Sequence, residues 1–148
     1  GREDLTDEVI RDGWYRTGDI ALIDEDGFIK ITGRQSRFSK IGGEMVPHVK
    51  IEEILNDAAG MNQEDGLLLA VTAVPDKRKG ERLIVLHLEL SRSVDALRQA
   101  LSDAGEPNIN IPSADSFHQV EELPILGTGK VDLKGIKQMA LELFGAPE

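Results

Sequence analysis

Hydrophobic and polar positions follow two different spacings in the first 60 residues, and each spacing predicts its own type of element. Ile20–Ile23 and Phe28–Ile31 are two short β-rich runs on either side of the turn sequence Asp24–Gly27, which predicts a β-hairpin. A helical period follows, and it predicts an amphipathic helix that begins near Pro47 and ends at Gly60. Its apolar positions are Ile51, Ile54, Leu55 and Ala58.

The second half of the chain predicts a small sheet with helices on it. Gly66–Val74 is continuously apolar, which favours a buried central strand. Leu83–Leu90 alternates in its second half and predicts the next strand, and Ser116–Leu123 predicts a short edge strand. A helix over 94–104 would have Ser93 as its N-cap. A last helix begins near Asp132 and is expected to bury Leu133, Ile136, Ala140, Leu143 and Phe144. From about residue 36 onward, the predicted fold class is α+β, a small sheet covered by helices.

Composition excludes several classes of function. The chain has 148 residues, and 17 Lys and Arg against 27 Asp and Glu give a net charge of −10. A surface with this charge argues against general binding to nucleic acid or to an anionic membrane. There is no cysteine, the three histidines (His48, His87, His118) share no metal-ligand spacing, and we predict no metal site. No apolar run approaches the roughly 20 residues that span a bilayer. These features predict a soluble protein without a transmembrane segment, from a reducing compartment.

Lys130 is the first candidate for chemistry. It follows the glycine-rich sequence Gly127-Thr-Gly129, so a flexible side chain with a compact charge stands on a mobile backbone. Such an ammonium group could neutralise charge that develops on a phosphoryl oxygen. The stretch is not a Walker A loop, because Val131 stands where that motif has Ser or Thr. An exposed loop lysine without a role is the alternative interpretation.

Asp19 and Arg34 are candidates for nucleotide binding. Asp19 ends the sequence Trp14-Tyr-Arg-Thr-Gly-Asp, and a carboxylate on such a turn can accept hydrogen bonds from two vicinal hydroxyls. Arg34 follows a predicted strand and could donate in a fork to phosphate or ribose oxygens. A turn aspartate that binds its own backbone and a surface arginine are the alternatives.

The segment from Gly33 to Pro47 combines positive charge with a double glycine. Arg34, Arg37 and Lys40 fall within seven residues, ahead of Gly42-Gly43. The glycines allow left-handed backbone or a close approach to a ligand, and the basic side chains favour an anionic partner.

These three segments together, in this order, resemble the C-terminal portion of the adenylate-forming acyl ligases: acyl-CoA synthetases, peptide-synthetase adenylation domains and luciferases. WYRTGD resembles the late core motif of the large N-terminal domain, GRQSRFSKIGGEMVP the hinge motif, and LPILGTGKVD the catalytic-lysine motif. The resemblance implies that residues 1–34 are the tail of the large N-terminal adenylation domain, including the hairpin. It also implies that residues 35–148 are a mobile C-terminal domain. Within the family, the hinge segment looks like the branch of the acyl-ACP synthetases that are fused to 2-acylglycerophosphoethanolamine acyltransferases.

The resemblance implies a two-step reaction, in which a fatty acid and ATP form an acyl-adenylate and a pantetheine thiol then takes the acyl group. Lys130 would be the catalytic lysine, Asp19 and Arg34 would bind the nucleotide, and Gly42 and Gly43 would line the pantetheine tunnel. The hinge would comprise Arg34, Gln35 and Ser36, and Ser36 replaces the usual acidic or lysine residue, which leaves the pivot open. ATP or AMP with Mg²⁺ would be bound mainly by the missing N-terminal domain, so we expect this chain alone to be inactive.

The acyl acceptor is the acyl carrier protein in the branch that the hinge segment resembles, and free CoA is the alternative. Arg37 and Lys40 are candidate contacts for the acidic carrier protein, and Lys77, Arg78, Lys79 and Arg82 form a second basic cluster. The branch further implies a cytoplasmic protein, or one associated with the inner membrane through segments outside this chain, and an acyltransferase half elsewhere. A non-catalytic acidic interaction module is the alternative from another class.

Overall fold

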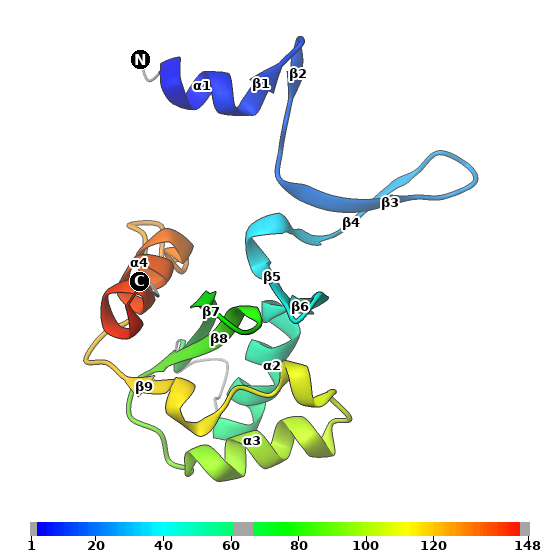
Figure 1. Cartoon of the computed structure of the whole chain (residues 1–148). Coiled ribbons are helices and arrows are strands. Elements are labelled where there is room, and N and C mark those ends of the chain that lie inside the picture. The colour runs from blue at the N-terminus through cyan, green and yellow to red at the C-terminus, as the bar shows by residue number, and fades with distance from the viewer. Residues whose placement is uncertain (1–2, 61–66, 146–148) are drawn as a thin grey trace. The chain divides into compact units, whose positions relative to one another are not determined.

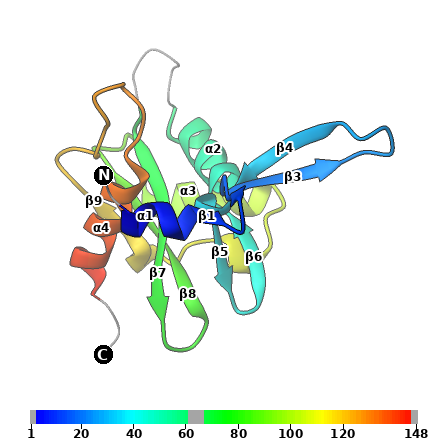
Figure 2. The same ribbon diagram turned by 90° about the horizontal axis from the view of Figure 1, so that it is seen from above.

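The computed structural model describes residues 3–60 and 67–145. The chain divides into two compact units, Gly1–Arg37 and Phe38–Glu148, and we describe each by itself (Figures 1 and 2). Within the described residues, no helix is both long enough and apolar enough to cross a membrane.

The first unit consists of a short helix and two small antiparallel pairs of strands. Its elements are α1 (Glu3–Val9), β1 (Ile10–Arg11), β2 (Trp14–Tyr15), β3 (Asp19–Ile23), β4 (Ile29–Arg34) and the 3-10 turn η1 (Gln35–Arg37). The hairpin predicted around Asp24–Gly27 is confirmed as β3–β4. The Asp24 carboxylate closes it by accepting from the backbone N–H groups of Asp26 and Phe28. Helix α1 was not predicted, because its polar sequence has little periodicity.

The second unit is an α+β fold, as predicted. Its elements are β5 (Phe38–Ile41), β6 (Glu44–Pro47), α2 (His48–Ala59), β7 (Leu69–Asp76), β8 (Gly80–His87), α3 (Val94–Asp103), η2 (Asn108–Asn110), η3 (Ala114–Ser116), β9 (Phe117–Gln119) and α4 (Leu133–Phe144). Strands β5 and β6 form a hairpin, and the main sheet has the order β7-β8-β9. In that sheet β7 and β8 are antiparallel, and β9 runs parallel to β8.

The main sheet is covered on both faces (Figure 1). Alternate residues of β7 and β8, such as Val71 and Val85, join a core with α2, α3 and the β5–β6 hairpin. The residues between them, such as Val74 and Ile84, join a second core with Ile136 of α4. Because both faces are buried, the paired stretches 69–74 and 83–86 are apolar except for Thr72 and do not alternate with polar residues.

Helix ends follow the predicted signals. The Ser93 hydroxyl accepts a hydrogen bond of 3.3 Å from the backbone N–H of Ala96 and caps α3, as predicted. Gly60 ends α2 with a left-handed φ of 80°, which a residue with a Cβ adopts only at a cost. The Asp132 carboxylate caps α4 by accepting from the backbone N–H of Lys134 at 3.1 Å.

Several details of the predicted fold were wrong. Strand β7 is buried but lies at the edge of the sheet, and β8 is the central strand. Strand β8 begins at Gly80 and ends at His87, so it starts and ends earlier than predicted, and β9 is shorter than predicted. Ile136 and Ala140 are buried as expected, but Leu133 and Leu143 are exposed because they lie on the outer side of α4. Gly66, the predicted start of the first strand, lies outside the described residues.

Candidate functional site

Lys130 lies in a small closed loop between β9 and α4. Ile125 and Val131 form an isolated antiparallel bridge, and the backbone N–H of Leu126 donates to the carbonyl of Lys130 at 2.7 Å. The N–H of Gly129 donates in turn to the carbonyl of Leu126 at 2.8 Å, and Gly129 has a φ of +81°. The backbone of the loop is therefore well hydrogen-bonded, while the Lys130 side chain is exposed.

The base of this loop is joined to helix α4. The backbone N–H of Asp132 donates to the carbonyl of Pro124 at 3.0 Å, and the Asp132 carboxylate caps the helix. One residue thus closes the loop and starts the helix. The loop cannot shift at its base without disturbing the start of α4.

Asp19 and Arg34 face each other in the first unit. They are partners in the β3–β4 register, and Asp19 Oδ1 lies 2.7 Å from Arg34 Nε. Thr17, Gly18, Arg34, Gln35 and Ser36 line an open hollow beside this ion pair. The structure brings the two predicted nucleotide-binding residues together, and it also gives each of them a partner within the hairpin.

The Gly42-Gly43 turn joins β5 and β6. Both glycines have a positive φ, +57° and +93°, so the double glycine is required by the backbone. Among the described residues, no atom beyond the two chain neighbours lies within 4 Å of the position that a Cβ on Gly43 would take, whereas a Cβ on Gly42 would lie 3.1 Å from Ile109 Cδ1. The turn is therefore open on the side of Gly43 and packed on the side of Gly42.

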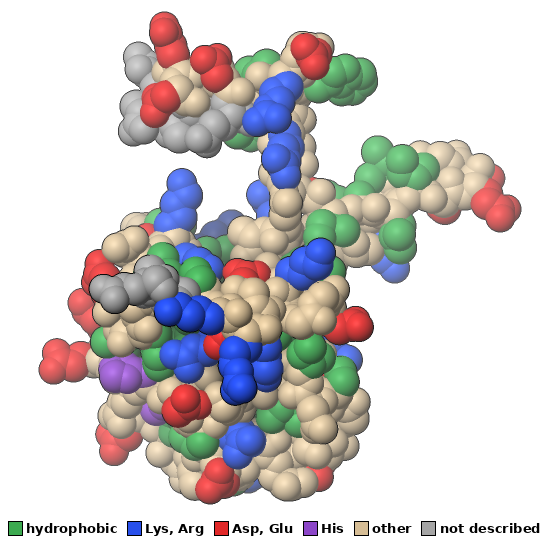
Figure 3. Space-filling model, in the orientation of Figure 1, with side chains coloured by type: hydrophobic (Ala, Val, Ile, Leu, Met, Phe, Trp, Pro, Cys, Tyr) green, Lys and Arg blue, Asp and Glu red, His purple; other side chains and the backbone are tan. Residues whose placement is uncertain are grey.

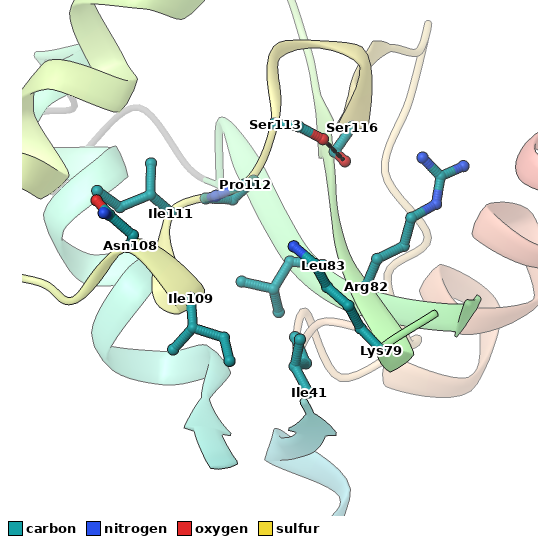
Figure 4. Close-up of a pocket in the computed structure, with 10 residues that line it drawn as sticks. All are labelled: Ile41, Lys79, Arg82, Leu83, Asn108, Ile109, Ile111, Pro112, Ser113 and Ser116. Atoms are coloured by element: carbon teal, nitrogen blue, oxygen red, sulfur yellow. Dashed lines mark hydrogen bonds between the residues drawn. The ribbon is translucent and has the colours of Figure 1, made fainter. Parts of the chain in front are cut away.

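A cavity of about 80 Å³ lies beside this turn (Figure 4). In Figure 4 the Lys79 side chain reaches toward Pro112 across the cavity, and the Arg82 guanidinium points away from it. Arg82 stacks on the Phe144 ring at 5.2 Å and lies 3.5 Å from a carboxylate oxygen of Asp115. Lys79 is thus the cation that faces the cavity. The lining residues are Ile41, Lys79, Arg82, Leu83, Asn108, Ile109, Ile111, Pro112, Ser113 and Ser116.

The basic turn between β7 and β8 is ordered by Asp76. Its carboxylate accepts from the backbone N–H groups of Lys79 at 2.8 Å and of Arg78 at 2.9 Å. These two bonds lower the pKa of Asp76 below its ordinary value. The carbonyl of Lys79 accepts from Gly42 N–H at 2.8 Å, which ties the basic turn to the glycine turn. Lys and Arg side chains gather on the face of the second unit shown in Figure 3.

The two residues predicted to contact a carrier protein fall in different units. Arg37 ends the first unit, and Lys40 is exposed on β5 of the second. The backbone N–H of Lys40 donates to a carboxylate oxygen of Glu81 at 2.8 Å.

Sequence reasoning missed two sets of hydrogen-bonded polar side chains in the second unit. Ser39 Oγ and His48 Nε2 share a hydrogen bond of 2.7 Å, and both residues are buried. The Glu106 carboxylate, 1% exposed, lies 2.5 Å from Lys50 Nζ and accepts from the Asn110 amide at 2.6 Å. These pairs join residues up to 56 positions apart, so no local pattern indicates them.

The described residues offer no obvious metal site. Within residues 3–60 and 67–145 there is no group of three or more His, Asp or Glu residues that could hold a metal ion.

The curated proteins most similar to this chain include several that are named as CoA ligases or synthetases. A long-chain-fatty-acid–CoA ligase of Salmonella typhimurium is 34% identical over 136 residues, and a feruloyl-CoA synthase of Amycolatopsis is 32% identical over 137 residues. The homologues of this chain are therefore acyl-CoA ligases and synthetases. The match covers 88% and 91% of this chain but only 22% and 26% of the relatives' length. No family model matches the chain.

Solved structures agree on the fold. ATP-bound MatB from Rhodopseudomonas palustris matches 97% of this chain and 28% of its own with a TM-score of 0.70 and 22% identity. The o-succinylbenzoate CoA synthetase of Bacillus subtilis, in complex with its acyl-adenylate intermediate, matches 93% of this chain and 27% of its own with a TM-score of 0.69 and 22% identity. The small α+β fold is thus that of the C-terminal domain of adenylate-forming ligases.

Proposed function

We propose that this chain is part of an AMP-forming acyl-CoA ligase, in which Lys130 promotes the formation of an acyl-adenylate. One observation carries the proposal: a closed loop holds an exposed lysine at a fixed place in a chain whose curated relatives are acyl-CoA ligases. The first step would join a carboxylate oxygen of the fatty acid to the α-phosphorus of ATP. The bond from that phosphorus to the bridging oxygen breaks, and pyrophosphate leaves.

Negative charge gathers on the α-phosphoryl oxygens in this step. An ammonium group that reaches them stabilises the transition state, and it does so best where water is excluded. Lys130 suits this role because its backbone is fixed and its side chain is exposed. Asp19 would accept from the ribose hydroxyls. A carboxylate has several acceptor sites, so its bond to Arg34 leaves capacity for a ligand.

The second step would use the Gly42-Gly43 turn. A thiol sulfur attacks the acyl carbonyl carbon, the bond to the AMP oxygen breaks, and the thiol proton passes to solvent. The open side of Gly43 supports a path for a thin pantetheine arm. The cavity beside the turn, with the Lys79 ammonium in it, supports an anionic group at the other end of that arm. CoA has this combination of a thiol arm and phosphates, and the curated relatives are named as CoA ligases.

The acyl carrier protein remains the second candidate acceptor, on the sequence resemblance to the acyl-ACP synthetase branch and on the basic residues Arg37 and Lys40. The two acceptors can be compared directly with the full-length ligase. Faster thioester formation with CoA supports the first candidate, and faster formation with carrier protein supports the second. If the carrier protein is the acceptor, Arg37→Glu with Lys40→Glu should raise the KM for it and leave adenylate formation intact. Equal loss in both steps would exclude that docking role.

The test of the proposal is Lys130→Ala in the full-length ligase. Carboxylate-dependent ATP–pyrophosphate exchange should fall by about 10²–10³-fold, the usual cost of losing one charge-stabilising donor. Thioester formation from synthetic acyl-adenylate should be unchanged. Lys134→Ala, an exposed lysine four residues away, is the matched control and should keep both activities. Unchanged exchange in Lys130→Ala would contradict the proposal and favour a non-catalytic interaction module.

The 148-residue chain by itself gives a second check. It should neither hydrolyse ATP nor form thioesters, because its match covers only 22% and 26% of the length of the two curated relatives. Any ligase activity of the isolated chain would overturn this expectation.

A further inference from the structure

Gly135 is a glycine where a helix has no need of one. It is the third residue of α4, and glycine is less favourable than alanine in a helix. Its φ is not positive, so conformational freedom does not explain its presence. A close packing contact is one physical reason for a glycine at a helix position that needs no special φ.

The packing reason is Pro124. A Cβ on Gly135 would lie 2.7 Å from the Cβ of Pro124, closer than two such carbons can approach. It would also lie 3.0 Å from Oδ2 of Asp132, the carboxylate that caps the helix. Pro124 therefore rests directly on the backbone of α4, in a space that only glycine leaves open.

Pro124 and Asp132 are the two ends of the Lys130 loop. The Asp132 N–H donates to the Pro124 carbonyl at 3.0 Å, and the Ile125–Val131 bridge and the Leu126–Lys130 hydrogen bond follow above it. The backbone position of Lys130 is thus set from this base. A Cβ at residue 135 would push on both ends of the loop.

We propose that Gly135 is a positioning residue for Lys130: its missing Cβ lets Pro124 sit against α4, and this contact sets where the loop presents the ammonium group. This inference rests on the proposed function of Lys130. A misplacement of about 1 Å can cost about 10²-fold in rate when the reacting groups must be aligned.

The experiment is Gly135→Ala in the full-length ligase. The rate of adenylate formation should fall by about 10–10²-fold. Thioester formation from synthetic acyl-adenylate should be unchanged, because that step does not use Lys130. A merely structural defect would lower both rates. Gly127→Ala is the matched glycine control. Its φ is not positive, and in the described part of the chain no atom beyond its two neighbours lies within 4 Å of the new Cβ, so the loss of adenylate formation should be smaller than in Gly135→Ala.

A second pair of variants tests the contact itself. Pro124→Gly removes the Cβ that the added methyl group of Gly135→Ala would meet, so the double variant should be faster in adenylate formation than Gly135→Ala alone. Pro124→Gly alone should lose adenylate formation selectively, and this variant keeps the inference testable if Gly135→Ala does not fold. Equal loss of both half-reactions in Pro124→Gly would overturn the positioning role.

Lys130→Ala, assayed in parallel, distinguishes a failure of the proposed function of Lys130 from a failure of the positioning role of Gly135. Normal adenylate formation in Lys130→Ala would overturn the proposed function. A defect in Lys130→Ala together with a normal rate in Gly135→Ala would overturn only the positioning role.

Discussion

The ion pair between Lys50 and Glu106 allows a quantitative test of how one wall of the cavity is held. Glu106 is buried, and its carboxylate bonds to Lys50 of α2 and to Asn110. In the sequence, Glu106 and Asn110 lie on either side of Asn108 and Ile109, and these two residues line the cavity that Lys79 faces. We choose Lys50→Met, which keeps most of the side-chain volume and removes the charge.

In Lys50→Met, the Glu106 carboxylate stays buried and keeps only its hydrogen bond from Asn110, and the expected loss of stability follows from this. Hydrogen bonds to charged groups contribute about 1.5–3 kcal/mol when buried. Lys50 itself is 61% exposed, and solvent screening reduces the value of such a partner. We therefore expect the free energy of unfolding at neutral pH to fall by about 1–2 kcal/mol.

The loss should also depend on pH. Burial raises the pKa of Glu106, but the bonds from Lys50 and Asn110 outweigh burial and hold this pKa below its ordinary value. In the wild type, the ionised carboxylate thus adds stability above its ordinary pKa, and this is lost as the pH falls through the folded-state value. Without Lys50, burial is opposed by Asn110 alone, so the folded carboxyl takes up its proton at higher pH. The difference between wild type and Lys50→Met should then be largest near pH 7 and shrink in acid.

Urea unfolding of the 148-residue chain at pH 7 and at about pH 4, followed by circular dichroism, measures both effects. Lys134→Met replaces an exposed lysine of α4 and should change stability by less than about 0.5 kcal/mol. The reasoning is refuted if Lys50→Met costs no more than this control, or if its cost is the same at both pH values.

Two further substitutions test the packing around the glycine turn. Ser39→Ala removes the hydroxyl from the buried Nε2 of His48 and should lower the unfolding free energy by about 1–3 kcal/mol in urea; a change within error would mean that the bond contributes nothing net. Gly42→Ala places a Cβ at a φ of +57° and 3.1 Å from Ile109 Cδ1, with an expected cost of about 1–2 kcal/mol. Adding Ile109→Val removes the crowded methyl group, so the double variant should lose less than the two single losses added together, and simple additivity would contradict the contact.

Local sequence patterns predicted the elements well and their arrangement less well. The helical period from Ile51 onward, the Ser93 cap and the β-hairpin at Asp24–Gly27 are local features, and all three are confirmed. The continuous apolar run of β7 indicated two covered faces correctly. It could not tell a central strand from an edge strand, because α2 and α4 bury β7 from both sides without a second neighbouring strand.

In the candidate site, too, the sequence indicated the local turns but not the contacts between distant segments. Glycine and lysine motifs marked the Lys130 loop and the Gly42-Gly43 turn, because tight turns require special residues at fixed positions. The Pro124–Gly135 contact depends on where α4 returns to the loop, which sequence spacing does not state. A glycine inside the final helical pattern was the one available signal.

Hydrogen bonds and an ion pair in the first unit reduce the number of candidate hinge residues among Arg34, Gln35 and Ser36. Arg34 pairs with Asp19, the backbone N–H of Gln35 donates to the Gly18 carbonyl at 2.8 Å, and the Gln35 side chain accepts from Arg16 at 2.7 Å. Turning the chain at Arg34 or Gln35 would break these bonds, whereas Ser36 is exposed and the division between the units follows Arg37. Nucleotide-binding candidates lie before this point and Lys130 and the glycine turn after it. If the proposed two-step reaction holds, the dihedral angles at Ser36 are therefore where we expect the chain to rotate, so that the Gly42-Gly43 turn takes the place of Lys130 beside the substrate.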